Sequence, residues 1–236
     1  MISGSVALVT GANRGIGRQF ALSLLERGAS RVYATARNPQ LVDIPGVEVL
    51  QLDITDPASI AAAAARAQDV DLLINNAGIS THQNLVTGDL EKIRLEMETH
   101  FFGTLGVVRA FAPVLAANGG GAIVNVLSVL SWLSYEGASA YCAAKAAEWS
   151  LTNGIRLELA RQGTLVTGLH LGSTDTDMMA GWDVPKNDPA DVVRAALDGI
   201  EAGQREVLAD ADSVQVKAAL AADPVVLYPQ TVGAGR

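Results

Sequence analysis

The sequence predicts an α/β fold in which one doubly wound parallel sheet of about seven strands carries helices on both faces. Short apolar runs typical of buried strands alternate with helical segments along the 236 residues, which is the pattern of a parallel sheet covered on both sides. A hydrophobic content of 49% is ample for a buried core. No linker or low-complexity tract divides the chain, so residues 1–236 are predicted to form a single dinucleotide-binding and catalytic domain.

The strands are expected where apolar runs are bounded by turn residues, at Val6–Val9, Arg31–Thr35, Val47–Leu52, Val70–Ile74, Ala122–Leu127, Leu165–His170 and Glu206–Leu208. Only Arg37–Gly46, with two prolines, separates the second strand from the third, so a short turn of helix is expected there. Asp56 and Pro57 predict the start of another helix, as N-cap and first helical residue. Longer helices are predicted over Asp89–Leu115 and Ala138–Arg161.

Composition excludes several classes of protein. The net charge of −8 argues against nucleic-acid binding, which needs a basic surface. Apolar runs are expected to be too short to cross a bilayer. The single cysteine, Cys142, permits no internal disulfide, and no charged leader opens the sequence, so we expect a cytoplasmic protein. No metal site is predicted.

The N-terminal strand leads through a glycine-rich turn, Thr10–Gly17, into a helical stretch that runs to about Arg27. Glycines let the backbone turn sharply and approach a ligand closely, and the free N–H groups of a helix start attract phosphate. The spacing differs from the G-x-G-x-x-G dinucleotide fingerprint. Without the strand and helix around it, the run could be a plain turn.

Tyr141 and Lys145 would lie side by side on a helix, where the ammonium would make the phenol a stronger acid, able to exchange a proton with a substrate oxygen. Ser128, at the end of the fifth predicted strand, could hydrogen-bond the same oxygen. Singly, each of these has an ordinary explanation: a chance pair on a helix surface, or a serine at a strand end.

Together these motifs resemble the short-chain dehydrogenase/reductase family, whose glycine turn reads Thr-Gly-x-x-x-Gly-x-Gly and whose active site carries Ser and Tyr-x-x-x-Lys. Thr10–Gly17, Asp53, Asn75–Gly78, Ser128 and Tyr141–Lys145 match in order and spacing over about residues 4 to 210. The resemblance implies a Rossmann-type fold that binds a nicotinamide cofactor, with Asp53 near the adenine amine, Asn75–Gly78 beneath the adenosine ribose, and Lys145 on the nicotinamide ribose. The residues expected to contact the cofactor are Gly11, Asn13, Arg14, Gly15, Ile16, Gly17, Arg37, Asp53, Ile54, Asn76, Ala77, Gly78, Tyr141, Lys145, Gly172, Thr174 and Thr176.

The end of the second strand indicates which cofactor is bound. An acid there would bond the ribose of NAD, but this strand ends in Arg37, and Arg14 adds a second positive charge within the glycine turn. Two guanidiniums suit a 2′-phosphate, so NADP(H) is predicted; otherwise Arg37 is an ordinary surface residue.

Two positions depart from the family pattern. The Asn that begins an Asn-x-x-Gly segment, and that holds a water on the proton relay in the family, is replaced by His100, which could hold the same water or be a packed structural residue. After the sixth strand, Leu171 stands where proline is usual, while Gly172 and Thr176 keep their places. Thr176 is expected to bond the nicotinamide carboxamide, although Thr174 could do so if the loop shifts.

We therefore expect an NADPH-dependent oxidoreductase that reduces a ketone or aldehyde to an alcohol, or the reverse, with Ser128, Tyr141, Lys145 and His100 as catalytic residues. The substrate is expected to be small and largely apolar, because its pocket would be lined mainly by apolar residues: Leu130, Leu133, Ser134, Met178, Met179 and Trp182. Residues 178–188 could form a lid. The resemblance implies a homodimer or homotetramer. The alternative is a protein that binds NADP(H) as a sensor or scaffold without catalysis.

Overall fold

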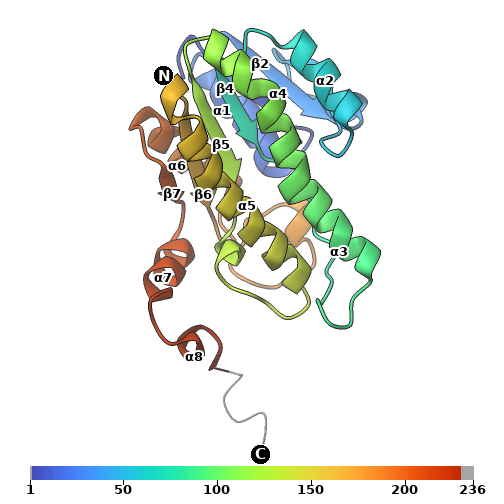
Figure 1. The fold of residues 1–236 in the computed structure, drawn as a ribbon, viewed down its shortest axis with the longest axis vertical. Helices are drawn as coiled ribbons and strands as arrows, with labels where there is room; N and C mark the ends of the chain where they lie inside the picture. Colours follow the sequence, from blue (N-terminus) through green and yellow to red (C-terminus); the bar gives the residue numbers. More distant parts are fainter. Residues whose placement is uncertain (1, 230–236) are drawn as a thin grey trace, which may run out of the picture.

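A computed structural model describes residues 2–229, so the first residue and the last seven residues of the predicted 1–236 domain lie outside the described part of the chain (Figure 1). Its centre is a seven-stranded sheet in the order β3-β2-β1-β4-β5-β6-β7, and every neighbouring pair is parallel. The strands are β1 Val6–Val9, β2 Arg31–Ala36, β3 Glu48–Gln51, β4 Leu72–Asn75, β5 Ala122–Val126, β6 Leu165–His170 and β7 Glu206–Leu208. The predicted fold class is confirmed.

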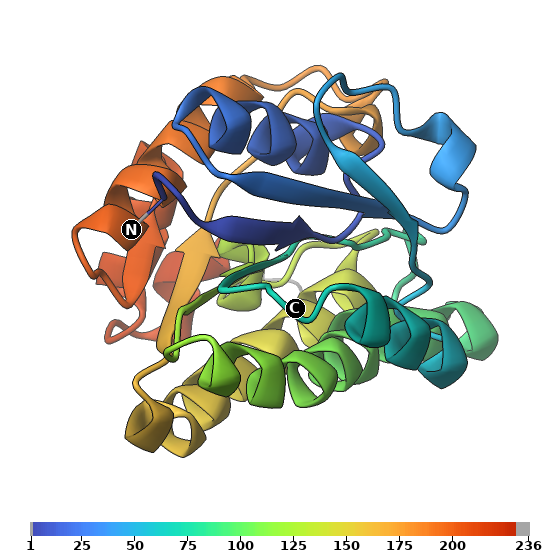
Figure 2. The same cartoon turned by 90° about the horizontal axis from the view of Figure 1, so that it is seen from above.

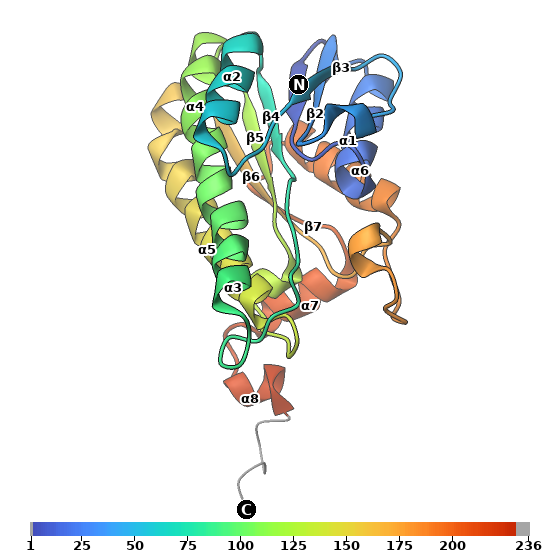
Figure 3. The ribbon, with the colours of Figure 1, turned by 90° about the vertical axis from the view of Figure 1, so that its right-hand side faces the viewer.

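Helices cover both faces of the sheet, as the views in Figures 2 and 3 show. Helices α1 (Gly15–Glu26) and α6 (Pro189–Glu201) pack on one face, and α2 (Pro57–Arg66), α4 (Thr104–Ala117) and α5 (Ser139–Glu158) pack on the other. Each face has its own apolar core, because strands buried on both sides present side chains to both helical layers.

The local predictions for the first half of the chain are confirmed. Asp56 caps α2 by accepting a hydrogen bond from the Ala58 amide at 2.9 Å, and Pro57 is the first helical residue. Between β2 and β3 the chain forms only the short 3-10 helix η1, Pro39–Leu41. The proline-rich connection is too short for a full crossover helix, so η1 closes the gap.

The predicted helix over Asp89–Leu115 is three consecutive segments. Helix α3 (Leu90–Met97) passes into a π-helical turn, η2 (Glu98–Gly103), and then into α4. The wider π turn changes the direction in which side chains leave the helix, and such turns are frequent at functional sites. Here the turn carries His100, and it packs against α5.

The segment Leu90–Ala117 also corrects an expectation about apolar runs. By length and composition alone its 28 residues could cross a membrane, contrary to the sequence-based expectation. In the fold this segment lies along the sheet, and Val107, Phe111 and Leu115 are buried in the core (Figure 3). The α4 part of this segment therefore packs as a core helix of the doubly wound domain.

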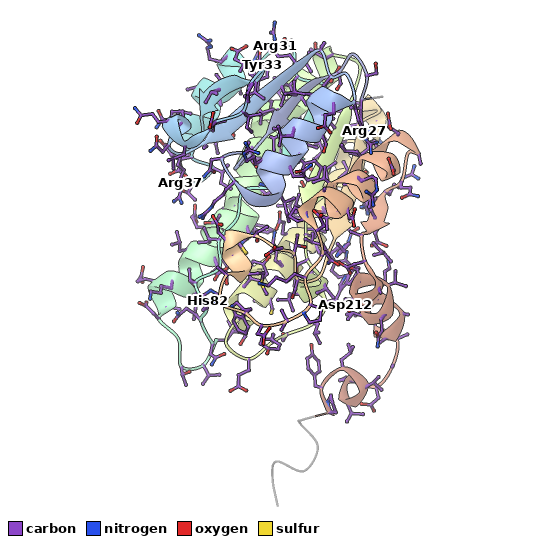
Figure 4. All side chains as sticks on the ribbon, turned by 180° about the vertical axis from the view of Figure 1, so that it is seen from behind. Arg27, Arg31, Tyr33, Arg37, His82 and Asp212 are labelled. Carbon is purple, nitrogen blue, oxygen red and sulfur yellow. The ribbon has the colours of Figure 1, made fainter. Side chains whose placement is uncertain are left out.

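From β1 the chain adds β2 and β3 on one side of the sheet, and then crosses over to add β4 to β7 on the other side. In such sheets ligands bind at the carboxyl ends of the strands beside this switch point. In Figure 4, Arg31 at the start of β2 lies at the top, and Arg37 after its end lies lower, toward the loop that carries His82 and the helix that carries Asp212. The remaining helices α7 (Ala211–Ala219) and α8 (Pro224–Leu227) follow β7 at this same end (Figure 1).

Candidate active site

The glycine turn forms a tight passage between β1 and α1. Gly11 and Gly15 have φ values of +67° and +53°, which side-chain-bearing residues rarely adopt. A Cβ atom on Gly17 would lie 2.3 Å from the Gly11 carbonyl oxygen, so only glycine lets the helix start so close to the turn. Arg14, the N-cap residue, makes no side-chain cap, and the first amides of α1 therefore remain available to an anion.

The loop after β4 holds this turn in place. Thr10 Oγ1 accepts hydrogen bonds from the backbone amides of Asn76 and Ala77, each at 2.9 Å. In return, Asn76 Nδ2 donates to the Thr10 carbonyl at 2.9 Å and to the Gly11 carbonyl at 3.3 Å. These bonds join the two strands at the switch point, so Asn76 supports the glycine turn directly.

The two predicted phosphate-binding arginines differ in their surroundings. Arg37 follows β2 and is exposed, and no ion pair to its guanidinium occurs within residues 2–229. Arg14 Nη1 lies 3.2 Å from Asp177 Oδ2, with both side chains 69% exposed. Such an exposed pair contributes little stability, so Arg14 is held only loosely by the segment that follows β6.

Asp53 and Ile54 follow β3. Asp53 Oδ1 accepts from the Thr55 amide at 2.9 Å and from Thr55 Oγ1 at 2.7 Å, whereas its Oδ2 makes no hydrogen bond to a described residue. This leaves one carboxylate oxygen for a donor such as an amine. Ile54 is buried. A Cβ atom added to Gly103 would lie 3.0 Å from the Ile54 side chain, so this side chain packs directly beneath η2.

Ser128 and Tyr141 meet at the end of β5. Ser128 is the N-cap of a short 3-10 helix, η3 (Val129–Ser131), and its Oγ accepts from the Leu130 amide at 3.1 Å. Its hydroxyl is also hydrogen-bonded with that of Tyr141, near the start of α5. The two hydroxyls predicted to share one substrate oxygen are therefore adjacent.

The ammonium of Lys145 has hydrogen-bond partners of its own besides its proximity to Tyr141. Its Nζ lies 5.9 Å from the centroid of the Tyr141 ring, and it donates to the Val126 carbonyl and to Glu148 Oε2, both at 2.7 Å. Burial is the largest single influence on Lys145 and opposes its charge, but Glu148, Tyr141 and Glu96 together outweigh burial, so the pKa of Lys145 is raised. Burial also acts most strongly against the Glu148 carboxylate, but Lys145 and His100 together outweigh burial and lower the pKa of Glu148.

The prediction that Lys145 makes Tyr141 a stronger acid is wrong as a net effect. Burial raises the pKa of Tyr141, and the Lys145 ammonium and the Ser128 hydrogen bond lower it only in part. The carboxylates of Glu148 and Glu96 raise it further. The phenol therefore keeps its proton more firmly in the folded protein than in water.

His100 lies behind Tyr141, with its ring edge-on to the phenol ring at a centroid distance of 5.2 Å. The imidazole is buried, with Nε2 2.8 Å from the Ile79 carbonyl oxygen and Nδ1 3.6 Å from Glu148 Oε2. His100 thus reaches Lys145 through Glu148. A Cβ on Gly78 would lie 2.6 Å from His100 Cε1, so this glycine leaves room for the imidazole.

The loop after β6 places the two candidate threonines differently. Thr174 is buried and its hydroxyl donates to the Gly172 carbonyl at 3.2 Å, while the Gly172 amide donates to Asp210 Oδ2 at 2.6 Å. Thr176 lies against the glycine turn, because a Cβ atom added to Gly15 would lie 3.2 Å from the Thr176 Cγ2 atom. Of the two, Thr176 is the one beside the expected cofactor path.

Residues 178–188 belong to a loop that is closed at its base. Thr174 and Asn187 form an isolated parallel bridge, and the Asn187 side chain donates to Asp210 Oδ2 at 2.7 Å. At its tip, the ring of Trp182 lies 6.2 Å from that of His82 and 6.3 Å from that of Tyr135. Rings from three separate loops thus meet at the carboxyl end of the sheet.

Sequence reasoning missed the acidic residues of the site and part of its aromatic rim. The missed residues are Glu96, Glu148, His82, Tyr135 and Asp210. A signal for Glu148 was available, because it lies on the apolar stripe of α5 together with Ala144, Leu151 and Ile155, all of them buried. The other four are recognised only by tertiary contacts, as when Glu96 on α3 accepts a hydrogen bond from Thr81 in the loop after β4. Within residues 2–229 no group of three or more His, Cys, Asp or Glu side chains is arranged to hold a metal ion.

Comparison with known proteins adds independent findings. Residues 5–186 match the family model of the short chain dehydrogenases. A short chain dehydrogenase of Monascus purpureus is 33% identical over 209 residues, which are 80% of this chain and 71% of that protein.

Two solved structures are similar over nearly the whole chain. The crystal structure of a short chain dehydrogenase from Burkholderia cenocepacia in complex with NADP is 40% identical, with a TM-score of 0.93 over 98% of this chain and 99% of that one. A short chain dehydrogenase/reductase from Burkholderia phymatum in complex with NAD is 23% identical, with a TM-score of 0.81 over 92% of each chain. The second likeness bears on the fold alone.

Proposed function

The chain belongs to the short-chain dehydrogenase family of oxidoreductases, and on that premise we propose that it is an NADPH-dependent enzyme that reduces a ketone or aldehyde to an alcohol. The reverse reaction uses the same groups. The adjacent hydroxyls of Ser128 and Tyr141, with Lys145 buried behind them, are the observation that carries this proposal.

The residues at the switch point fit a dinucleotide. The passage between Gly11 and Gly17 would be filled by a single Cβ, and the uncapped start of α1 offers amides to a pyrophosphate. Asp53 Oδ2 suits the adenine amine, and Asn76, Ala77 and Gly78 would line the ribose. When bound, the nicotinamide would supply or accept a hydride.

Arg37 and Arg14 favour NADP(H) over NAD(H). Arg37 is exposed, with its guanidinium unpaired among the described residues, and Arg14 can exchange its weak pair with Asp177 for a phosphate. The similarity to an NADP-bound dehydrogenase at 40% identity supports this preference.

In the reductive direction, Tyr141 would donate its proton to the substrate oxygen while Ser128 orients that oxygen. Lys145 would bind the nicotinamide ribose and stabilise the phenolate left on Tyr141. His100 stays a candidate for the relay behind Lys145. Positioning and acid catalysis of this kind contribute orders of magnitude in rate.

The substrate proposal is a small, largely apolar carbonyl compound. Trp182 and Met178 are each about two-fifths exposed near the site, at 40% and 41%, and the His82 and Tyr135 rings extend the same rim. Such side chains suit an uncharged ligand. We also propose a cytoplasmic homodimer or homotetramer, with residues 178–188 as a lid over the substrate.

The experiment is NADPH consumption against a panel of ketones, aldehydes and quinones, run beside Tyr141→Phe. We expect turnover by the natural protein, none by the variant, and NADPH binding by both. Tight NADPH binding without turnover of any carbonyl would favour the sensor or scaffold alternative.

A further inference from the structure

Four ionisable side chains are buried together behind Tyr141. Lys145 and Glu148 come from α5, Glu96 from α3 and His100 from η2, and they are 4%, 2%, 0% and 1% exposed, respectively. Burying a charge is costly unless it is paired and hydrogen-bonded. The way these charges pair with one another therefore determines the electrostatic field at the Tyr141 hydroxyl.

Glu148 occupies the centre of the cluster. Its Oε2 accepts from Lys145 Nζ at 2.7 Å and lies 3.6 Å from His100 Nδ1, and its Oε1 accepts from Thr104 Oγ1 at 3.3 Å. Glu96 is placed differently, since its Oε1 accepts from Thr81 Oγ1 at 2.8 Å and its Oε2 lies 3.8 Å from His100 Nε2. Glu148 is thus the carboxylate in direct contact with the ammonium.

The two distances from Lys145 decide the electrostatic outcome. The ammonium is 2.7 Å from a Glu148 oxygen but 5.9 Å from the centroid of the Tyr141 ring. Because a carboxylate that close cancels much of the field of the cation at longer range, the pair acts on the phenol as a dipole. The other groups that bear on this phenol are Glu96, whose charge also favours the protonated form, and the hydroxyl of Ser128.

We infer that Glu148 is a positioning residue that holds Lys145 and opposes the ionisation of Tyr141, which favours the rate of carbonyl reduction over the rate of alcohol oxidation at a given pH. In reduction, the Tyr141 O–H bond breaks and its proton joins the substrate oxygen as hydride adds to the carbonyl carbon. Oxidation needs the opposite, a phenolate that takes the proton of the alcohol while hydride leaves the carbon. This inference rests on the proposed function for its consequence, but the charge state of Tyr141 can be measured without turnover.

The test is Glu148→Gln, which removes the charge while its side-chain oxygen can still accept a bond from Lys145. We expect tyrosinate absorbance, titrated with pH and corrected by subtracting the same variant carrying Tyr141→Phe, to show Tyr141 ionising on the order of one pH unit lower. The alkaline rise in the rate of alcohol oxidation should move by the same amount. An unmoved or upward-moved titration of Tyr141 would overturn the inference.

Glu96→Gln is the matched control, because it also removes a buried carboxylate near His100 but one that does not touch Lys145. Its effect on Tyr141 should be clearly smaller, and an equal effect would refute the special role of Glu148. If Glu148→Gln does not fold, Glu148→Asp withdraws the carboxylate from Lys145 and should lower the titration less, in the same direction; an unchanged titration there also refutes the inference. A natural protein without any carbonyl turnover would count against the proposed function while the tyrosinate titration still tests Glu148.

Discussion

Replacing Arg37 by alanine is expected to weaken the binding of NADPH far more than that of NADH. The two cofactors differ only in the 2′-phosphate, and Arg37 stands where the second strand ends, at the position that recognises this group in doubly wound folds. Its guanidinium forms no ion pair within residues 2–229. No bond from this guanidinium to a described residue would therefore have to break before Arg37 binds the phosphate.

The size of the effect follows from the kind of bond. A hydrogen bond to a charged group contributes about 1.5–3 kcal/mol, which corresponds to a roughly 10- to 150-fold rise in the Kd of NADPH. Arg14 should contribute less, because its Nη1 must first leave Asp177, 3.2 Å away. Removing the exposed Arg37 side chain should leave the free energy of unfolding within about 0.5 kcal/mol.

The assay is the Kd of each cofactor, measured by titration calorimetry for the natural protein, Arg37→Ala and a control, Arg31→Ala. Arg31 lies at the opposite end of the same strand, paired with Asp69 at 2.7 Å (Figure 4), so its loss should change neither Kd. Equal weakening of NADPH and NADH by Arg37→Ala would refute the assignment, as would an unchanged Kd for NADPH.

Three further outcomes are expected. Gly17→Ala should lower the free energy of unfolding by about 1–3 kcal/mol and weaken NADPH binding at least about tenfold. The control is Gly154→Ala, whose added Cβ would meet no atom within 4 Å, and it should have neither effect. Thermal melts measure the change in stability, and calorimetry measures the change in NADPH binding. His100→Asn should keep kcat within about tenfold, or ~1.4 kcal/mol in barrier, if an amide can replace the imidazole, and a larger change in steady-state rate would indicate another role. Burial lowers the pKa of His170 to about 4 while unfolded histidine titrates near ~6.5, so the unfolded chain binds the extra proton and stability falls as pH drops through this range. Urea unfolding at pH 7 and pH 4.5 should show His170→Gln losing less stability than the natural protein, by up to about 3 kcal/mol, and equal losses would contradict the assignment.

The fold could be predicted because its signals are local. Each strand is a short apolar run ended by turn residues, and all seven lie within two residues of the predicted bounds. The π turn at Glu98–Gly103 could not be predicted in the same way. A π turn and an α turn differ in which carbonyl each amide reaches, and the apolar pattern of Leu90–Ala117 continues through both.

The arrangement of the candidate site could be predicted where it depends on motifs, and could not be predicted where it depends on tertiary contacts. Ser128, Tyr141 and Lys145 lie together as the motif implies. The rings of Trp182 and Tyr135 come from loops 47 residues apart along the chain, and nothing in either loop indicates the other.

The acidity of Tyr141 shows how a correct local pair can give a wrong net prediction. The spacing of Tyr141 and Lys145 placed an ammonium beside the phenol, and the ammonium does lower the pKa of Tyr141. The larger opposing influence is burial, which the sequence does not show, and Glu148, one turn beyond Lys145 on the same helix, adds to it. Because an acid on an otherwise buried helical stripe needs a cation as its partner, Lys145 acts on the phenol as one half of a pair with Glu148 and not as a lone ammonium.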